Sequence, residues 1–365
     1  MSDAGAKQQP DPDFDPQDLD PALHRMEQEA PPEWRTDLTY QDIEPILTIK
    51  EYRALNLCYL QPKHGPKEIQ PNVVYRDKAT QQIKFLLLKN ALSPSAHNQA
   101  LDVLMNADWQ HCARAANGQK HGKKLTVGWL PPLPGKTKGH DYDNVRTAPT
   151  LDQPNLLHGL RPLVREMNAK LCEYLQPYYL NAIGTILNAI QREDKQDDLS
   201  RVKPVPEQLR EALRQPLPEH TQEPLEPFEE IREMFRYPPD PLNFLQNLDG
   251  WAGFTYSLWG TLFSTLELNR NILFMAHEDK RNVKGALIGI TALGEFVGGR
   301  LILPRYGYGA ELQPHDLLIC DNNHELHGNL GPLVGERFSV VAYFHVSLIE
   351  YARREGHWRP LAVEN

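Results

Sequence analysis

Short apolar runs alternate with turn-rich segments along much of the chain. Residues 73–76 and 83–88 are rich in Val, Ile, Phe and Leu and predict two strands. Residues 160–190 carry apolar side chains at helical spacing, and Pro177 divides them into two expected helices. The first half of the chain therefore predicts both helices and strands.

The pattern changes near residue 250, where short β-rich runs begin to follow one another at close intervals. Glycine and proline turns separate these runs, and no internal repeat is found. This rhythm is typical of an antiparallel sandwich or barrel. The expected strands are residues 254–258, 266–275, 286–292, 300–303, 316–319 and 338–344.

Two segments lack such a pattern and account for much of the high proline content, which is 31 residues in 365. Residues 1–35 predict a disordered acidic tail, and residues 191–230 predict an acidic, proline-rich linker or insertion. We therefore expect an N-terminal extension with supporting helices at 36–190 and a β-rich core at 231–365. Four widely spaced cysteines and no leader or membrane-spanning pattern predict an intracellular protein in a reducing compartment.

The net charge of −9 hides an uneven distribution, because residues 1–40 carry −7 and residues 41–190 carry +6. A basic stretch at 118–140 lacks the first glycine of a phosphate-binding loop and holds three prolines, which excludes that motif. Its lysines fit either a solvated loop or a contact with a phosphate backbone. The lysines in question are Lys120, Lys123, Lys124, Lys136 and Lys138.

Candidate metal ligands follow the strand expected at 266–275. His277 and Asp279 are two residues apart, so in an extended chain both project to the same side. A His-x-Asp triplet arises about once by chance in such a chain, so the pair could also be an ordinary turn. Two histidines and one carboxylate leave three positions on iron(II) for a 2-oxo acid and oxygen. The third ligand is therefore expected at His324 or His327.

A candidate carboxylate cradle follows ten residues after His327. Arg337 and Ser339 are alternate residues of an expected strand and share a face. A guanidinium and a hydroxyl together suit a carboxylate. Arg337 could instead form a surface ion pair with Glu336 or Asp321.

This order of motifs, with Gly298-Gly299-Arg300-Leu301 and Pro314-His315-Asp316 between them, resembles the iron(II)/2-oxoglutarate dioxygenases. Within that superfamily it is similar to the TET/JBP nucleic-acid oxygenases, in particular a fungal-type member, over residues 250–351. The resemblance implies an α+β fold with a double-stranded β-helix (jelly-roll) core, flanking helices and an N-terminal elaboration. It also favours His327 over His324, because His327 has an adjoining glycine and the arginine at the family's offset.

The resemblance further implies the cofactors and the site. Iron(II) would be held by His277, Asp279 and His327, and 2-oxoglutarate by Arg337 and Ser339, with oxygen as the third reactant. The residues at the family's base-contacting positions are Asn282, Tyr343 and His345. A turn residue at Asn282 and a core pair at Tyr343 and His345 are the structural alternatives.

The expected activity is oxidation of 5-methylcytosine in DNA to the hydroxymethyl, formyl and carboxyl forms. N6-methyladenine, thymine and RNA bases remain open. A methyl group in a duplex is out of reach of a buried metal, so the base is expected to flip out of the stack. The partner is then duplex DNA and the location the nucleus, with no membrane and no protein partner expected. A prolyl-type protein hydroxylase is the alternative, although such enzymes generally use lysine where Arg337 stands, and a non-catalytic module is disfavoured by the intact triad.

Overall fold

The computed structural model describes residues 38–109, 122–129, 150, 152–175, 178–179, 182–183, 186, 256–279, 282–283, 286–323 and 325–349. The tail expected at 1–35 and the insertion expected at 191–230 lie outside the described residues, so both stay predictions. The described helices are α2 Ile49–Ala54, η2 Pro62–His64, α3 Pro94–Met105 and α5 Pro154–Tyr174. The described strands are β1 Thr39–Ile43, β2 Lys67–Glu68, β3 Val73–Asp77, β4 Ile83–Leu88, β5 Lys123–Gly128, β6 Thr265–Arg270, β7 Ile288–Leu303, β8 Tyr308–Ala310, β9 Leu317–Cys320 and β10 Gly328–Tyr343.

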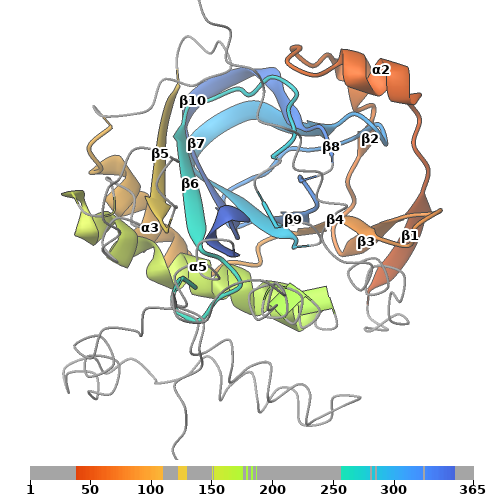
Figure 1. Ribbon diagram of the computed structural model, residues 1–365. Coiled ribbons are helices and arrows are strands. Elements are labelled where there is room, and N and C mark those ends of the chain that lie inside the picture. Colours follow the sequence, from red (N-terminus) through yellow and green to blue (C-terminus); the bar gives the residue numbers. More distant parts are fainter. Residues whose placement is uncertain are drawn as a thin grey trace, which may run out of the picture.

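Two long strands, β7 and β10, form an antiparallel ribbon that connects two sheets (Figure 1). The start of β7 pairs with β9, and its end pairs with β8. The larger sheet has the order β1-β3-β4-β9-β7-β10-β6-β5, and the smaller one adds β8 and β2 to the far end of the ribbon. A bridge between His277 and His327 extends the smaller sheet. Two sheets that share a curved ribbon make a double-stranded β-helix, which confirms the predicted fold class.

Glycines allow β7 to turn from one sheet into the other without ending. Gly298 and Gly299 have positive φ values of 85° and 71°. A Cβ atom at Gly298 would lie 2.1 Å from the carbonyl oxygen of Pro332 on β10. The bend therefore needs glycine both for its backbone conformation and for space.

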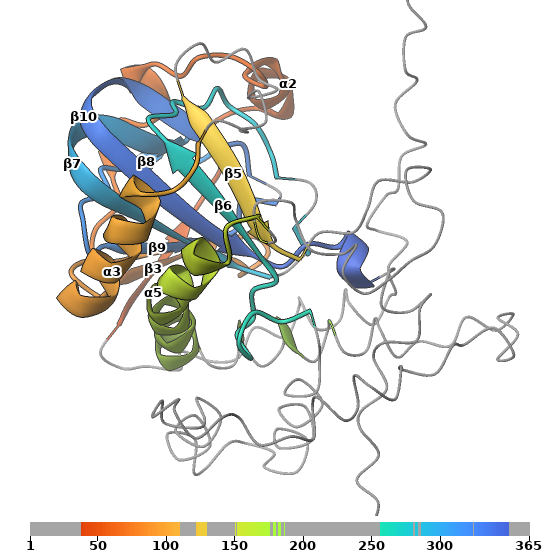
Figure 2. The same cartoon turned by 90° about the vertical axis from the view of Figure 1, so that its left-hand side faces the viewer.

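Helices α3 and α5 lie side by side and cover the outer face of the larger sheet (Figure 2). Helix α5 presents an apolar stripe at helical spacing that is almost completely buried. The stripe consists of Leu160, Leu163, Val164, Met167 and Leu171. Phe338 of β10 and Trp109 meet in the same layer, with ring centroids 5.9 Å apart. The first of the two helices expected at 160–190 is thus confirmed as α5, which begins at Pro154 and ends at Tyr174, before Pro177. Most of the second lies outside the described residues and stays a prediction.

The inner face of the larger sheet has its own apolar core at one end of the barrel. Successive side chains alternate between the faces, so Leu86 packs against the helices whereas Phe85 and Leu87 point inward. Phe85 packs with Tyr75 and Tyr308 in this inner core. At the other end of the interior, polar side chains replace the apolar ones, and the candidate site lies there.

Some sequence expectations were wrong in detail. The described part of the strand expected at 254–258 is a turn, and the strand expected at 266–275 ends at Arg270, where Asn271 adopts a φ of 55°. The runs expected at 286–292 and 300–303 are one strand, β7. Among the helices that the structure describes, none combines the length and apolarity needed to cross a membrane.

Candidate metal centre

A pocket of about 620 Å³, partly open to solvent, occupies the polar end of the barrel interior. Its walls come from β6, β7 and β10 and from the segments that follow β6, β8 and β9. The polar residues among those that line it are Glu267, Asn269, His277, Asp279, Asn322, His327, Asn329, Arg337, Ser339. The pocket thus brings together both motifs that the sequence predicted, the His-x-Asp…His set and the Arg-x-Ser pair.

His277, Asp279 and His327 place their ligand atoms within 4.8 Å of one another. The Nε2 atom of His277 lies 3.4 Å from Oδ1 of Asp279, and that of His327 lies 3.5 Å from Oδ2 of Asp279. Reciprocal backbone hydrogen bonds of 3.0 and 2.9 Å between His277 and His327 hold the two chain segments in register. The three donors therefore converge on one point from two adjacent extended segments.

Backbone carbonyls orient both imidazoles. Nδ1 of His277 lies 2.9 Å from the oxygen of Met275, and Nδ1 of His327 lies 3.0 Å from the oxygen of Glu325. Because a carbonyl only accepts, each Nδ1 must carry the hydrogen. In the neutral form of each ring, Nε2 then has a lone pair on the side of Asp279, as a metal ligand requires.

The surroundings of Asp279 favour the ionised form of its carboxyl group, which is the form that binds a metal. Burial raises the pKa of its carboxyl, but hydrogen bonds and positive charge from the protonated imidazoles of His277 and His327, present when no metal is bound, outweigh burial and hold the pKa well below the ordinary value. The side-chain amide of Asn322 also donates to Oδ2 of Asp279. Asn322 was not recognised from the sequence; the only signal was its place in the polar run before His327.

Arg337 lies at the other side of the pocket with a buried guanidinium, 7% exposed. Nη1 donates to the carbonyl oxygen of Gly299 over 2.7 Å, and Nη2 donates to that of Ile272 over 2.5 Å. Burial lowers the pKa of Arg337 to about 10, so the group stays charged at neutral pH. Among the described residues, no carboxylate forms an ion pair with it, which excludes the surface pair with Glu336 or Asp321.

The neighbours of Arg337 complete a polar wall. Ser339 lies on the same face of β10, and the amide of Asn269 on β6 reaches its hydroxyl over 3.4 Å. Asn269 is 2% exposed, and its Oδ1 has no hydrogen-bond partner among the described residues. A buried cation, a hydroxyl and an unsatisfied amide suit a bound anion with hydrogen-bonding capacity.

The residues present fit iron(II) and 2-oxoglutarate on chemical grounds. Two neutral imidazoles and one carboxylate are the facial donor set of iron(II) oxygenases, which keep coordination positions open for a 2-oxo acid. The buried Arg337 without a carboxylate partner fits the distal carboxylate of that acid. Both features line one pocket.

The predicted base-contacting residues lie next to this pocket but do not line it. Asn282 is buried and donates to Asn322 over 2.8 Å, and its backbone forms a bridge with His345. Tyr343 lies on the inward face of β10 with Arg337, its ring centroid 6.3 Å from that of the buried His345. Their contact with a base stays a prediction.

The predicted phosphate-contacting lysines fall partly outside the described residues, namely Lys120, Lys136 and Lys138, as does the alternative ligand His324. Lys123 is exposed on β5. Lys124 faces inward and forms an ion pair with Glu267, a pocket residue not recognised from the sequence. A phosphate contact by Lys124 would compete with this carboxylate.

Comparison with known proteins identifies the segment that carries the site. The Tet_JBP family model, described as the oxygenase domain of the 2OGFeDO superfamily, matches residues 252–346.

Two curated relatives are each described as a bifunctional helicase and thymine dioxygenase JBP2. The Leishmania infantum protein is 35% identical over 99 residues, covering 26% of this chain and 9% of that protein. The Leishmania major protein is 34% identical over 117 residues, covering 30% and 11%. The chain thus spans about a tenth of the length of the relatives it matches.

Similar solved structures include "NgTET1 in complex with 5mC DNA", with a TM-score of 0.42 and 14% identity over 90% of this chain and 89% of that one. Another is "The structure of OsALKBH1", with a TM-score of 0.32 and 11% identity over 76% and 100% of the two chains. The matched segment, 252–346, holds His277, Asp279, His327, Arg337 and Ser339. This part of the chain is therefore similar to the oxygenase domain of the TET/JBP family, which works with iron(II), 2-oxoglutarate and oxygen.

Proposed function

We propose that the protein oxidises the methyl group of a modified base in DNA, with 5-methylcytosine as the first substrate and hydroxymethyl-, formyl- and carboxylcytosine as successive products. One observation carries the proposal: the metal ligands and the Arg337–Ser339 cradle line a single pocket within a segment that matches the TET/JBP oxygenase model. A nuclear location follows from a DNA substrate alone.

The chain's own residues would divide the work as follows. His277, Asp279 and His327 would hold iron(II), which together with 2-oxoglutarate and oxygen supplies the oxidising chemistry while the cosubstrate is converted to succinate. Arg337 and Ser339 would fix the distal carboxylate and thereby orient the cosubstrate. The inner apolar core closes the other end of the barrel and limits access of water. No side chain needs to act as a general acid or base on the methyl group.

A flipped base would need compensation for its lost stacking and pairing. Tyr343 would stack on the base, and stacking on an aromatic ring is worth about 1–3 kcal/mol. His345 and Asn282 would read the base edge if the substrate reaches beyond the described pocket. Because both are buried and hydrogen-bonded, His345→Gln and Asn282→Ser test this role better than alanine variants, which would also cost stability.

Thymine is the second candidate substrate, because the curated relatives are described as thymine dioxygenases. Thymine and 5-methylcytosine carry the same methyl group on C5, so both could present it to the same metal. N6-methyladenine places its methyl group on an exocyclic nitrogen and would need a different pose. A prolyl-type hydroxylase is disfavoured by the buried Arg337, since such enzymes generally use lysine there.

Substrate-stimulated succinate release would test the proposal. The protein is incubated with iron(II), 2-oxoglutarate and matched duplexes that contain 5-methylcytosine, unmodified cytosine or N6-methyladenine, or with proline-rich peptides. We expect the 5-methylcytosine duplex to stimulate release most and His327→Ala to abolish it. Stimulation by peptide and not by any duplex would overturn the assignment in favour of a protein hydroxylase.

A further inference from the structure

The loop at residues 321–327 fixes two of the three metal ligands. Within the loop, the side-chain amide of Asn322 donates a hydrogen bond to Asp279, and the backbone carbonyl of Glu325 accepts one from Nδ1 of His327. His327 itself ends the loop. A shift of this loop would therefore rotate His327 and release Asp279 at the same time, so whatever anchors the loop also sets the geometry of the metal centre.

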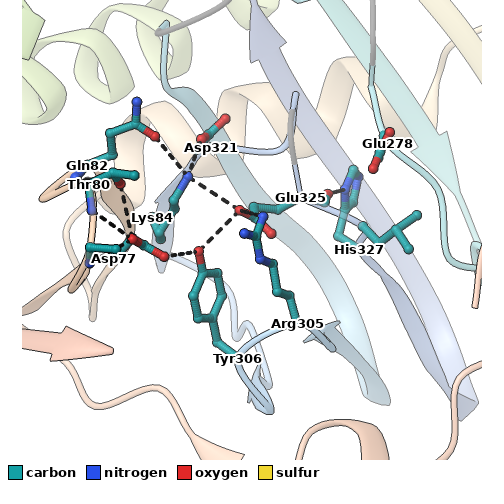
Figure 3. Close-up of polar contacts among 12 residues, drawn as sticks. Asp77, Thr80, Gln82, Lys84, Glu278, Arg305, Tyr306, Asp321, Glu325 and His327 are labelled. Atoms are coloured by element: carbon teal, nitrogen blue, oxygen red, sulfur yellow. Dashed lines mark hydrogen bonds and ion pairs between the residues drawn. The ribbon is translucent and has the colours of Figure 1, made fainter. Parts of the chain in front are cut away.

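A buried lysine anchors the loop from β4. The ammonium group of Lys84 lies 3.0 Å from Oδ2 of Asp321 and 3.3 Å from Oε1 of Glu325, so it bridges the beginning of the loop to its later part (Figure 3). Lys84 is 5% exposed. Arg305 and Tyr306 add contacts of 3.2 and 3.3 Å to the same oxygen of Glu325.

The charge of this lysine is secured by the groups around it. Burial lowers the pKa of Lys84, but the carboxylates of Asp321 and Glu325 outweigh burial, and the net shift is upward. Removing the ammonium would leave two carboxylates close together in a buried place, which is costly. The ion pairs therefore hold the loop in one position.

A tyrosine anchors the loop from α2. The hydroxyl of Tyr52 accepts a hydrogen bond of 2.6 Å from the backbone N–H of Leu326, and it donates one of 3.2 Å to Oε1 of Glu278. Leu326 precedes one metal ligand, and Glu278 lies between the other two. One oxygen atom thus connects the two segments that carry the metal ligands. Arg305 lies over the ring, 5.7 Å from its centroid.

We propose that Tyr52 and Lys84 are positioning residues of the metal centre, which together hold the 321–327 loop against the His277–Asp279 segment. Both lie outside the matched segment, 252–346, so the N-terminal part of the chain would complete a site whose ligands all come from the oxygenase domain. Outer partners that orient metal ligands typically change metal affinity 10- to 100-fold when they are removed. The inference rests on the metal centre of the proposed function but not on the identity of its substrate.

Tyr52→Phe gives the sharpest test because it removes one oxygen atom and leaves the ring. Tyr75→Phe is its control: the hydroxyl of Tyr75 also accepts a backbone hydrogen bond, from Gln70 over 3.0 Å, but it contacts no metal-binding segment. Tyr75 is buried, whereas Tyr52 is half-buried. The dissociation constant of Co(II), a spectroscopic substitute for iron(II), is measured by visible absorption, and the melting temperature is measured alongside.

We expect Tyr52→Phe to raise the dissociation constant of Co(II) about tenfold or more, and Tyr75→Phe to change it less than twofold, with similar losses in melting temperature. Equal Co(II) affinity in Tyr52→Phe and the wild type would overturn the role of Tyr52. A change of similar size in Tyr75→Phe would show a general effect of stability and would also overturn it.

Lys84→Met tests the other anchor, with Lys89→Met as its control. Lys89 forms a 2.7 Å ion pair with the buried Asp316 just beyond the same strand, away from the metal ligands. We expect weaker Co(II) binding in Lys84→Met only, with partial recovery in Lys84→Arg; unchanged affinity would refute the role. If Lys84→Met does not fold, the Co(II) absorption bands of Lys84→Arg are compared with those of the wild type. A change in the bands would support the role of Lys84, and identical bands would refute it. Intact Co(II) binding without oxidation of any base would contradict the proposed function and leave this inference standing.

Discussion

Arg337 offers a quantitative prediction about cosubstrate binding. Its guanidinium uses two of its five N–H groups on the carbonyls of Gly299 and Ile272, and it has no carboxylate partner among the described residues. A hydrogen bond to a charged group is worth about 1.5–3 kcal/mol. Loss of even one such bond to the distal carboxylate in Arg337→Met should raise the dissociation constant of 2-oxoglutarate about 10- to 150-fold.

The assay compares two acids, because Arg337→Met also removes hydrogen bonds within the fold. Binding of 2-oxoglutarate and of 2-oxobutyrate, which lacks the distal carboxylate, is titrated to the Co(II)-loaded protein. The wild type should prefer 2-oxoglutarate, and Arg337→Met should lose that preference while it binds 2-oxobutyrate almost unchanged.

A matched control lies on the neighbouring strand. Arg270 forms an ion pair with Glu336, and its guanidinium lies over the ring of Phe338. It does not line the pocket. Arg270→Met should keep the preference for 2-oxoglutarate. If Arg337→Met weakens both acids by the same factor, or neither, Arg337 is not the anchor of the distal carboxylate.

Three further predictions follow from the site and the fold. Alanine at any of the three metal ligands should abolish Co(II) binding, whereas His324→Ala should retain it; the reverse result for His327 and His324 would exchange their roles. Leu163→Ala, at a fully buried position of α5, should cost about 2–5 kcal/mol of unfolding free energy in urea titrations. A loss below 1 kcal/mol would contradict the close packing of α5 on the sheet. Burial raises the pKa of Asp77, but hydrogen bonds from Thr80 and Tyr306 outweigh it and the net shift is downward. Its stabilising effect is therefore present above the unfolded pKa of about 3.9 and lost as the pH falls through the folded value. Between pH 6 and pH 2 the wild type should lose more unfolding free energy than Asp77→Asn, and parallel losses would refute this.

The local pattern of apolar and polar residues was enough to predict some of the elements and some of the site residues. The strand expected at 83–88 has the bounds of β4, because its run of residues, apolar except for Lys84, is buried on both faces. The His-x-Asp and Arg-x-Ser pairs were found because alternate residues of an extended chain share a face, and that geometry depends on sequence spacing alone.

Elements that depend on distant partners were not predictable in this way. The glycines at 298 and 299 indicated a turn, yet β7 continues through them because β10 supplies hydrogen-bond partners on both sides of the bend. Tyr52 lies 226 residues from Glu278, and Lys84 lies 237 residues from Asp321. No local pattern distinguishes these residues from an ordinary tyrosine and lysine, because only the fold brings them to the metal centre.

Mass spectrometry of nucleosides tests the central claim most directly. Duplex DNA that contains 5-methylcytosine is incubated with the protein, iron(II), 2-oxoglutarate and oxygen, then digested and analysed, with His327→Ala in parallel. The account predicts hydroxymethylcytosine, followed by the formyl and carboxyl forms, with the wild type only. Unchanged 5-methylcytosine under conditions in which the same sample binds Co(II) and 2-oxoglutarate would contradict it, and hydroxymethyluracil in its place would make thymine the substrate.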